Sequence, residues 1–169
     1  KRQLVKAGLI MPTVQRVLRA SMKTVQSDED YFTGKAHPPV FDGNQLDGVR
    51  MIKLAHGMTV DQIPPLVRLQ AADEPVLMGR DYFDGYAGES LLNTPQAIAR
   101  VARASRYLRR MIVSAENSRD LQQRPLTFRW VVLRGNAEEI QIAPRNESQS
   151  VVELRIPYHG RRPADADPT

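Results

Sequence analysis

Residues 111–132 read MIVSAENSRDLQQRPLTFRWVV, and the alternation of apolar and polar side chains along this stretch decides the expected fold. Met111, Val113 and Ala115 alternate with their neighbours up to a turn at residues 117–120. Past that turn, the apolar side chains that share one face are Leu126, Phe128, Trp130 and Val132. Because the side chains of a β-strand point alternately to its two faces, the stretch predicts two β-strands joined through a turn.

The same period of two continues to residue 156. A turn at Gly135 is followed by Ile140 and Ile142, and after a second turn at residues 146–150 the alternation resumes. Short alternating strands with a turn signal every 8–12 residues or so are typical of an antiparallel β-sandwich. The side chains predicted to be buried are Val113, Leu126, Phe128, Trp130, Ile140, Leu154 and Ile156.

Two short motifs flank the turn. The pattern M-x-V-x-A-x-x-S-x-D runs from Met111 to Asp120, and P-L-T-F-R-W runs from Pro125 to Trp130. With these motifs, residues 107–157 resemble the first half of a PKD domain, an immunoglobulin-like sandwich found in bacterial secreted proteins. The resemblance implies that the tryptophan fills the space between two sheets. It also implies a first strand at residues 96–104, where propensity alone favours a helix.

The chain also departs from the PKD pattern. Residues 131–135 (VVLRG) stand where PKD domains usually carry an acidic, glycine-bearing segment. Residues 121–124 replace the acidic loop of the family, so the resemblance does not carry a calcium site over to this chain. The two closing strands expected after Tyr158 are absent. We therefore expect either that another segment or chain completes the fold or that the sequence is truncated.

The N-terminal half shows helical rather than alternating periodicity. Apolar residues at helical spacing predict helices over residues 12–26 and 45–56. Residues 66–70 alternate as a short strand, and the many turn-forming residues between 71 and 93 indicate a connecting region. The predicted fold class is α+β, with a small N-terminal helical segment (1–92), an incomplete immunoglobulin-like antiparallel β-sandwich (93–158) and a flexible tail (159–169).

The composition, 41% apolar and 25% charged over 169 residues, is that of a globular chain. No apolar run approaches the roughly 20 residues that span a bilayer. The absence of cysteine excludes disulfides and thiol chemistry. The net charge of +5 includes a basic run at residues 1–26 and an arginine cluster at residues 100–110. No nucleic-acid-binding signature accompanies them, so we interpret both as solvated surface and predict no specific binding of nucleic acid.

Candidate binding residues lie in two loops. His37 is followed by two prolines that fix the backbone of its loop, and Tyr82, Phe83 and Tyr86 form an aromatic loop. Aromatic faces stack on sugars and bases, so these four residues are a candidate binding platform. The histidines lack metal-ligand spacing, and the chain lacks a nucleophile elbow and a phosphate-binding glycine loop. The sequence therefore predicts no catalytic residue, metal or cofactor.

These observations predict a non-catalytic interaction or spacer module of a larger bacterial secreted or periplasmic protein, acting in adhesion, assembly or spacing near carbohydrate. The expected partners are further polypeptide of the same protein, another subunit, or polysaccharide. The chain begins at Lys1 without an initiator Met or a signal peptide, so we expect it to be a piece of something longer. The alternative is a fragment of a hydrolytic enzyme whose active site is completed by missing sequence around the His37 loop.

Overall fold

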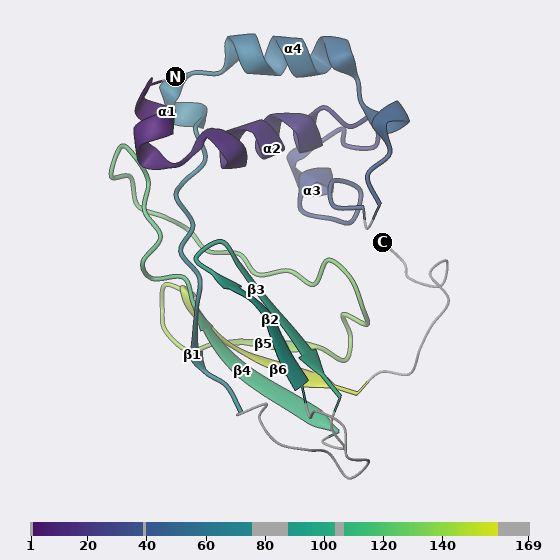
Figure 1. The fold of residues 1–169 in the computed structure, drawn as a ribbon, viewed down its shortest axis with the longest axis vertical. Coiled ribbons are helices and arrows are strands. Elements are labelled where there is room, and N and C mark those ends of the chain that lie inside the picture. Colours follow the sequence, from purple (N-terminus) through teal and green to yellow (C-terminus); the bar gives the residue numbers. More distant parts are fainter. Residues whose placement is uncertain (1, 39, 76–87, 104–106, 159–169) are drawn as a thin grey trace.

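Helices gather at one end of the molecule and β-strands at the other (Figure 1). The structure is a computed structural model that describes residues 2–38, 40–75, 88–103 and 107–158. Helices that precede antiparallel sheets confirm the predicted α+β class. None of the described helices is long and apolar enough to cross a membrane.

The helical end is built from short helices, several of which begin at side-chain caps. They are α1 (Arg2–Ala7), α2 (Ile10–Ala20), α3 (Asp28–Tyr31), η1 (Gly43–Gln45), α4 (Gly48–Gly57) and η2 (Val60–Gln62). Ser27 caps α3, Asp42 caps η1 and Asp47 caps α4, and each side chain accepts a hydrogen bond from a backbone N–H of the first turn. The predicted helix at residues 45–56 is confirmed as α4, which starts three residues later than predicted.

Helix α2 is shorter than the predicted helix at residues 12–26, because it ends at Ala20. The Ser21 hydroxyl donates to the carbonyl of Leu18 (2.7 Å), and the backbone of Met22 then bridges to Leu46. Met22 and Val25 are each only 2% exposed and pack with Ala36. The free energy gained by burying these two side chains against the following loop favours this path of the chain over a further helical turn. A second apolar cluster joins Leu9, Ile63 and Leu66.

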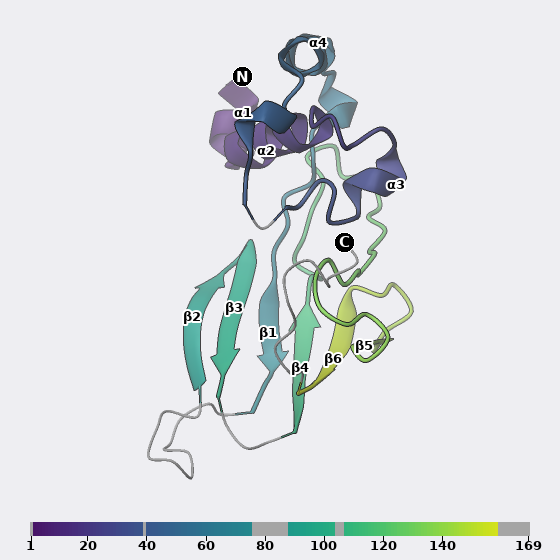
Figure 2. The same cartoon turned by 90° about the vertical axis from the view of Figure 1, so that its right-hand side faces the viewer.

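The β end holds a four-stranded antiparallel sheet of order β1-β4-β6-β5 and a hairpin, β2-β3 (Figure 2). The strands are β1 (Gln70–Asp73), β2 (Gly88–Thr94), β3 (Ala97–Ala102), β4 (Leu108–Ser114), β5 (Gln141–Pro144) and β6 (Val151–Pro157). The hairpin lies beside β1, where the N–H of Leu69 donates to the carbonyl of Pro95 (2.6 Å). Strand β3 confirms that residues 97–102, where propensity alone favours a helix, are extended.

Three predictions about strands are wrong. The strand predicted at residues 66–70 is displaced to β1, which begins only at Gln70, and before it only Leu66 pairs, in an isolated bridge with Arg119. The predicted connecting region contains β2. Residues 126–133, which alternate like a strand, belong to no strand of the described structure. Alternation marks which side chains are apolar, but a strand forms only where a neighbouring strand takes its backbone hydrogen bonds.

Burial at the β end is less complete than predicted. Val113 is buried, with 5% of its surface exposed, whereas Ile156 is 39% exposed. The other residues of the predicted core are half-buried: Leu126, Phe128, Trp130, Ile140 and Leu154. The reason is that an irregular segment and a two-stranded hairpin, rather than a full second sheet, pack near the four-stranded sheet.

Specific hydrogen bonds join the helical end to the β end. Leu66 and Arg119 exchange two backbone hydrogen bonds (2.8 and 3.0 Å). The Arg124 guanidinium pairs with the buried carboxylate of Asp120 (2.7 Å) and donates to the carbonyl of Asp61 (2.8 Å). The loop after β4 is therefore fixed to the chain that leaves the last helical turn.

Candidate functional site

His37 lies in the loop that follows α3. Its Nε2–H donates to the carbonyl of Tyr31 (3.1 Å), and the two rings meet edge to face with their centroids 5.7 Å apart. Ala36, directly before it, is completely buried in the cluster with Met22 and Val25. The loop is thus anchored to the core, and the imidazole is held on the backbone of its own loop.

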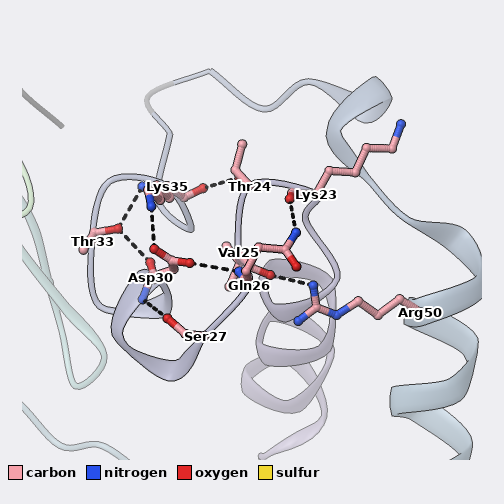
Figure 3. A network of polar contacts seen from close by, with 9 residues as sticks. All are labelled: Lys23, Thr24, Val25, Gln26, Ser27, Asp30, Thr33, Lys35 and Arg50. Atoms are coloured by element: carbon pink, nitrogen blue, oxygen red, sulfur yellow. Dashed lines mark hydrogen bonds and ion pairs between the residues drawn. The ribbon is translucent and has the colours of Figure 1, made fainter.

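A polar network around Asp30 gives this loop its shape (Figure 3). The Asp30 carboxylate accepts from the backbone N–H of Gln26 (3.0 Å) and pairs with Lys35 (2.5 Å). The Ser27 hydroxyl accepts from the N–H of Asp30 (3.1 Å), and the Thr33 hydroxyl donates to the Asp30 carbonyl (2.7 Å). The hydrogen bond from Lys35, with help from that of Gln26, lowers the pKa of Asp30. The network therefore closes the loop around an ionised carboxylate.

A groove of about 720 Å³ opens beside His37. Its walls come from α2, α3, α4 and the segment at residues 62–67. Apolar side chains, among them Val17, Leu54 and Met58, form part of its lining. A groove of this size lies within the range of small-molecule sites, which is about 300–1,000 Å³.

Three arginines line the groove, and each donates to a backbone carbonyl rather than to a carboxylate. Arg19 donates to Ala36 (2.6 Å), Arg50 to Val25 (2.5 Å), which Figure 3 shows, and Arg16 to Gln62. No ion pair joins these three side chains to an acid of the described residues, although Asp28 also lines the groove. A guanidinium has five N–H donors, so each retains capacity for an anion. The groove can therefore hold an anionic group beside an apolar surface.

The electrostatics of the groove keep its ring side chains uncharged. Burial lowers the pKa of His37, and the positive charge of Arg19 lowers it further. Burial also raises the pKa of Tyr31, although Arg19 and Arg16 act in the opposite direction. At neutral pH the imidazole and the phenol are therefore both neutral. The net positive charge of the groove comes from its three arginines, against the single carboxylate of Asp28.

The structure places only one of the four predicted binding residues. Tyr82, Phe83 and Tyr86 lie outside the described residues. Another aromatic residue, Phe32, is 43% exposed beside Tyr31, and the guanidinium of Arg129 lies 5.2 Å from its ring centroid. Sequence reasoning missed the groove arginines as a group, because Arg16 and Arg19 lie in the run interpreted as solvated surface and Arg50 lies in a separate predicted helix.

A second candidate surface is the segment between Pro125 and Leu133. No backbone hydrogen bond joins it to another described residue. The indole Nε1–H of Trp130 donates to the carbonyl of Gln149 (2.8 Å), which fixes the segment to the turn before β6. Its apolar side chains are half-buried, and Val131 is 38% exposed. The segment therefore combines peptide groups that no other described backbone group pairs with and apolar side chains that are incompletely buried.

Comparison of the chain with protein-family models, with curated proteins and with solved structures finds no match.

Proposed function

We propose that the chain is a non-catalytic interaction module of a larger bacterial secreted or periplasmic protein. In this proposal it provides one sheet of an immunoglobulin-like sandwich, and added polypeptide strands pair with residues 126–133 to form the second sheet. The observation that carries the proposal is the alternating segment at residues 126–133, which lacks backbone pairing to the described residues.

The strand order supports this interpretation. One sheet of a constant-type immunoglobulin domain has the strand order A-B-E-D, and the other contains C, F and G. The order β1-β4-β6-β5 corresponds to A-B-E-D, since β1 precedes β4, and β5 precedes β6 along the chain. Strand C then falls between β4 and β5, where residues 126–133 lie. Strand C pairs with F, so a segment without F has no partner for its backbone.

The edges of the four-stranded sheet favour the same surface. The edge strand β5 ends at Pro144, which cannot donate a ladder hydrogen bond, and the hairpin lies beside the other edge strand, β1. Residues 126–133 contain no proline, and no described strand lies paired beside them. Addition of a strand there would satisfy the free peptide groups and cover the half-buried side chains.

Sedimentation of the chain over a wide concentration range, together with binding of a dye that reports exposed apolar surface, tests the proposal. We expect dye binding and reversible association, and slower amide exchange at residues 126–133 on association. Val131→Lys should weaken association at least tenfold, because it places a charge on the pairing surface. Val49→Lys, the matched change on exposed α4, should leave association unchanged. A stable monomer without dye binding would show that the chain covers this surface itself.

The hydrolytic alternative makes a different prediction about His37. In a hydrolase its ring would have to exchange a proton with substrate, yet its Nε2–H donates to the Tyr31 carbonyl. Turnover of a panel of ester, amide and glycoside substrates, lost in a folded His37→Gln variant, would favour the enzyme over the interaction module.

A further inference from the structure

The groove beside His37 extends along α2. Its lining residues on this helix run from Pro12 to Ala20, which corresponds to about 12 Å at a rise of about 1.5 Å per residue. Helix α4 runs back beside α2, because a backbone bridge between Met22 and Leu46 joins the end of α2 to the approach to α4 (Figure 1). The first turn of α4 therefore lies near the end of α2, and the last turn of α4 lies toward the start of α2.

The end of the groove nearest His37 carries two guanidinium groups. Arg19, in the last turn of α2, donates to the carbonyl of Ala36 (2.6 Å). Arg50, in the first turn of α4, donates to the carbonyl of Val25 (2.5 Å). Because Ala36 and Val25 pack in one apolar cluster, these two hydrogen bonds hold both guanidinium groups at the same end of the groove.

Both guanidinium groups keep donors that a ligand can reach. Only Nη1 of each bonds to another described residue. Within the described part of the chain, the only buried side-chain polar atom without a hydrogen bond belongs to Arg109, so Nε and Nη2 of Arg19 and Arg50 retain accessible surface. Arg16, the third arginine of the groove, is exposed. The groove therefore offers several unused N–H donors to an anion.

The other end of the groove is apolar. Leu54 and Met58 follow Arg50 at intervals of four residues, so this row leads along α4 away from the guanidinium groups. Pro12, at the start of α2, and Pro64 line the groove as well. Leu54 is 37% exposed, so its side chain is accessible to a ligand. A molecule that spans the groove thus meets guanidinium donors at one end and hydrocarbon at the other.

We infer that this groove binds a small, soluble phosphate monoester with an apolar organic group. The phosphate accepts from Arg19 and Arg50, and the organic group packs against Leu54 and Met58. Guanidinium donors suit phosphate oxygens, and a phosphate monoester carries a charge of about −1.5 to −2 at pH 7. The three arginines of the groove exceed its single acid, Asp28, by two charges, which favours a dianion over a monoanion. This inference does not depend on the proposed strand addition.

Naphthyl phosphate is a suitable probe, because it joins a phosphate dianion to a rigid apolar group. Naphthyl sulfate has the same shape and carries a single negative charge, so it is the matched control for the charge of the ligand. Inorganic phosphate lacks the organic group and is the control for the apolar end of the groove.

The experiment uses the whole chain with carbon-13-labelled methionine methyl groups. Titration with naphthyl phosphate at pH 7.5 should shift the methyl signal of Met58 in a saturable way, and the signal of Met111 on β4 should stay fixed. Naphthyl sulfate and inorganic phosphate should each bind roughly tenfold more weakly, the first for lack of charge and the second for lack of apolar contact. Equal binding of naphthyl phosphate and naphthyl sulfate, or no shift of Met58, would overturn the inference without any variant.

Two variants localise the phosphate. Arg19→Gln and Arg50→Gln each remove one guanidinium, so each should bind naphthyl phosphate roughly tenfold more weakly and lose most of the preference for phosphate over sulfate. Arg145→Gln removes the same charge from an exposed site at the β end and should leave both affinities unchanged. If both groove variants keep the full preference for naphthyl phosphate, the phosphate does not bind at these arginines and the inference is wrong.

A lipid headgroup could present the same phosphate chemistry on a membrane surface. Vesicles of phosphatidylcholine and phosphatidate distinguish this source from a soluble ester. We expect no cosedimentation of the chain with these vesicles under conditions in which naphthyl phosphate saturates the Met58 signal. Cosedimentation that Arg19→Gln abolishes, without a response of Met58 to the soluble ester, would overturn the inference in favour of a lipid surface.

Discussion

The surroundings of Asp120 stabilise the ionised form of its carboxylate. Its carboxylate accepts from Arg124 Nη2 (2.7 Å), Arg124 Nε (3.0 Å) and the backbone N–H of Gln122 (2.8 Å). These bonds, the side chain of Arg124 first, lower the pKa of Asp120 to about 2. The motif residue Ser118 has a similar role, since its hydroxyl accepts from the N–H of Arg68 (2.9 Å). The motif that suggested a family thus supplies structural hydrogen bonds.

The low pKa of Asp120 makes a prediction about acid stability. Its ordinary pKa is 3.8, so the ionised form stabilises the fold above about pH 4, and this contribution is lost as the pH falls toward 2. Asp120→Asn should therefore have a lower urea midpoint than the parent at pH 7 and lose less between pH 4 and pH 2. Asp28→Asn, an exposed control, should behave like the parent. Parallel losses in the parent and Asp120→Asn would contradict the prediction.

His37 gives a pH dependence of its own. Burial and Arg19 hold its pKa below the ordinary 6.5, so the unfolded chain takes up a proton before the folded chain does. Its contribution to stability is complete above pH 6.5 and falls as the pH drops through the unfolded and then the folded pKa. Between pH 7.5 and pH 5.5, His37→Gln should lose less stability than the parent, whereas exposed His56→Gln should not. Thermal unfolding at the two pH values measures this difference.

At the scale of elements, β6 contributes more buried residues to the sheet than any other described strand, whereas α4 contributes none. Val152 of β6 is fully buried, between Val113 of β4 and Pro144 of β5. Glu153, also buried, is paired with Arg155 (2.7 Å) and Arg110 (3.2 Å). Buried side chains of the inner strand β6 therefore stabilise the β end, whereas α4 is stabilised by its N-terminal cap and by half-buried contacts.

The same substitution in these two elements should have different effects. Val152→Ala removes two buried methyl groups and leaves a cavity, so the free energy of unfolding should fall by about 2 kcal/mol. Val49→Ala on α4 removes methyl groups that are 66% exposed, and alanine is the better helix former, so stability should change by less than about 0.5 kcal/mol. Urea unfolding measures both values. Equal effects would show that α4 is packed as firmly as the central strand.

Across the part of the chain that the structure describes, the molecule has several small buried clusters instead of one continuous core. Two apolar clusters lie at the helical end, and Val113, Ala115 and Val152 are buried at the β end. Backbone hydrogen bonds between Leu66 and Arg119 join the two ends, and so does the Arg124 side chain, which bonds to Asp120 and to the carbonyl of Asp61. Cooperative unfolding depends on shared packing, so we expect the two ends to unfold separately.

We therefore expect two unfolding transitions. Trp130 is the only tryptophan and reports on the β end by fluorescence, whereas ellipticity at 222 nm reports mainly on the helices. The two probes should give different urea midpoints, because the two ends bury their apolar side chains in separate places. Coincident transitions by both probes would show instead that the molecule unfolds as one unit.

Much of the local structure is determined by the sequence itself. Alternation within residues 111–115 and 141–157 specifies strands, whereas the strand at residues 97–102, where propensity favours a helix, was implied only by the family resemblance. The turn at Gly135, whose φ is 101°, needs a glycine. Asp47 marks the start of α4 because its side chain caps the first turn. Such features depend on neighbours within a few residues, so a linear pattern is enough to predict them.

Only the tertiary structure decided the rest. Residues 126–133 alternate like a strand but need a partner to become one, and α2 ends at Ala20 because Met22 and Val25 find burial against a later loop. The three groove arginines come from α2 and α4, and only the packing of these elements brings them together. Periodicity records which face of an element is apolar. It does not record which other element covers that face, because pairing and packing depend on residues far away in the chain.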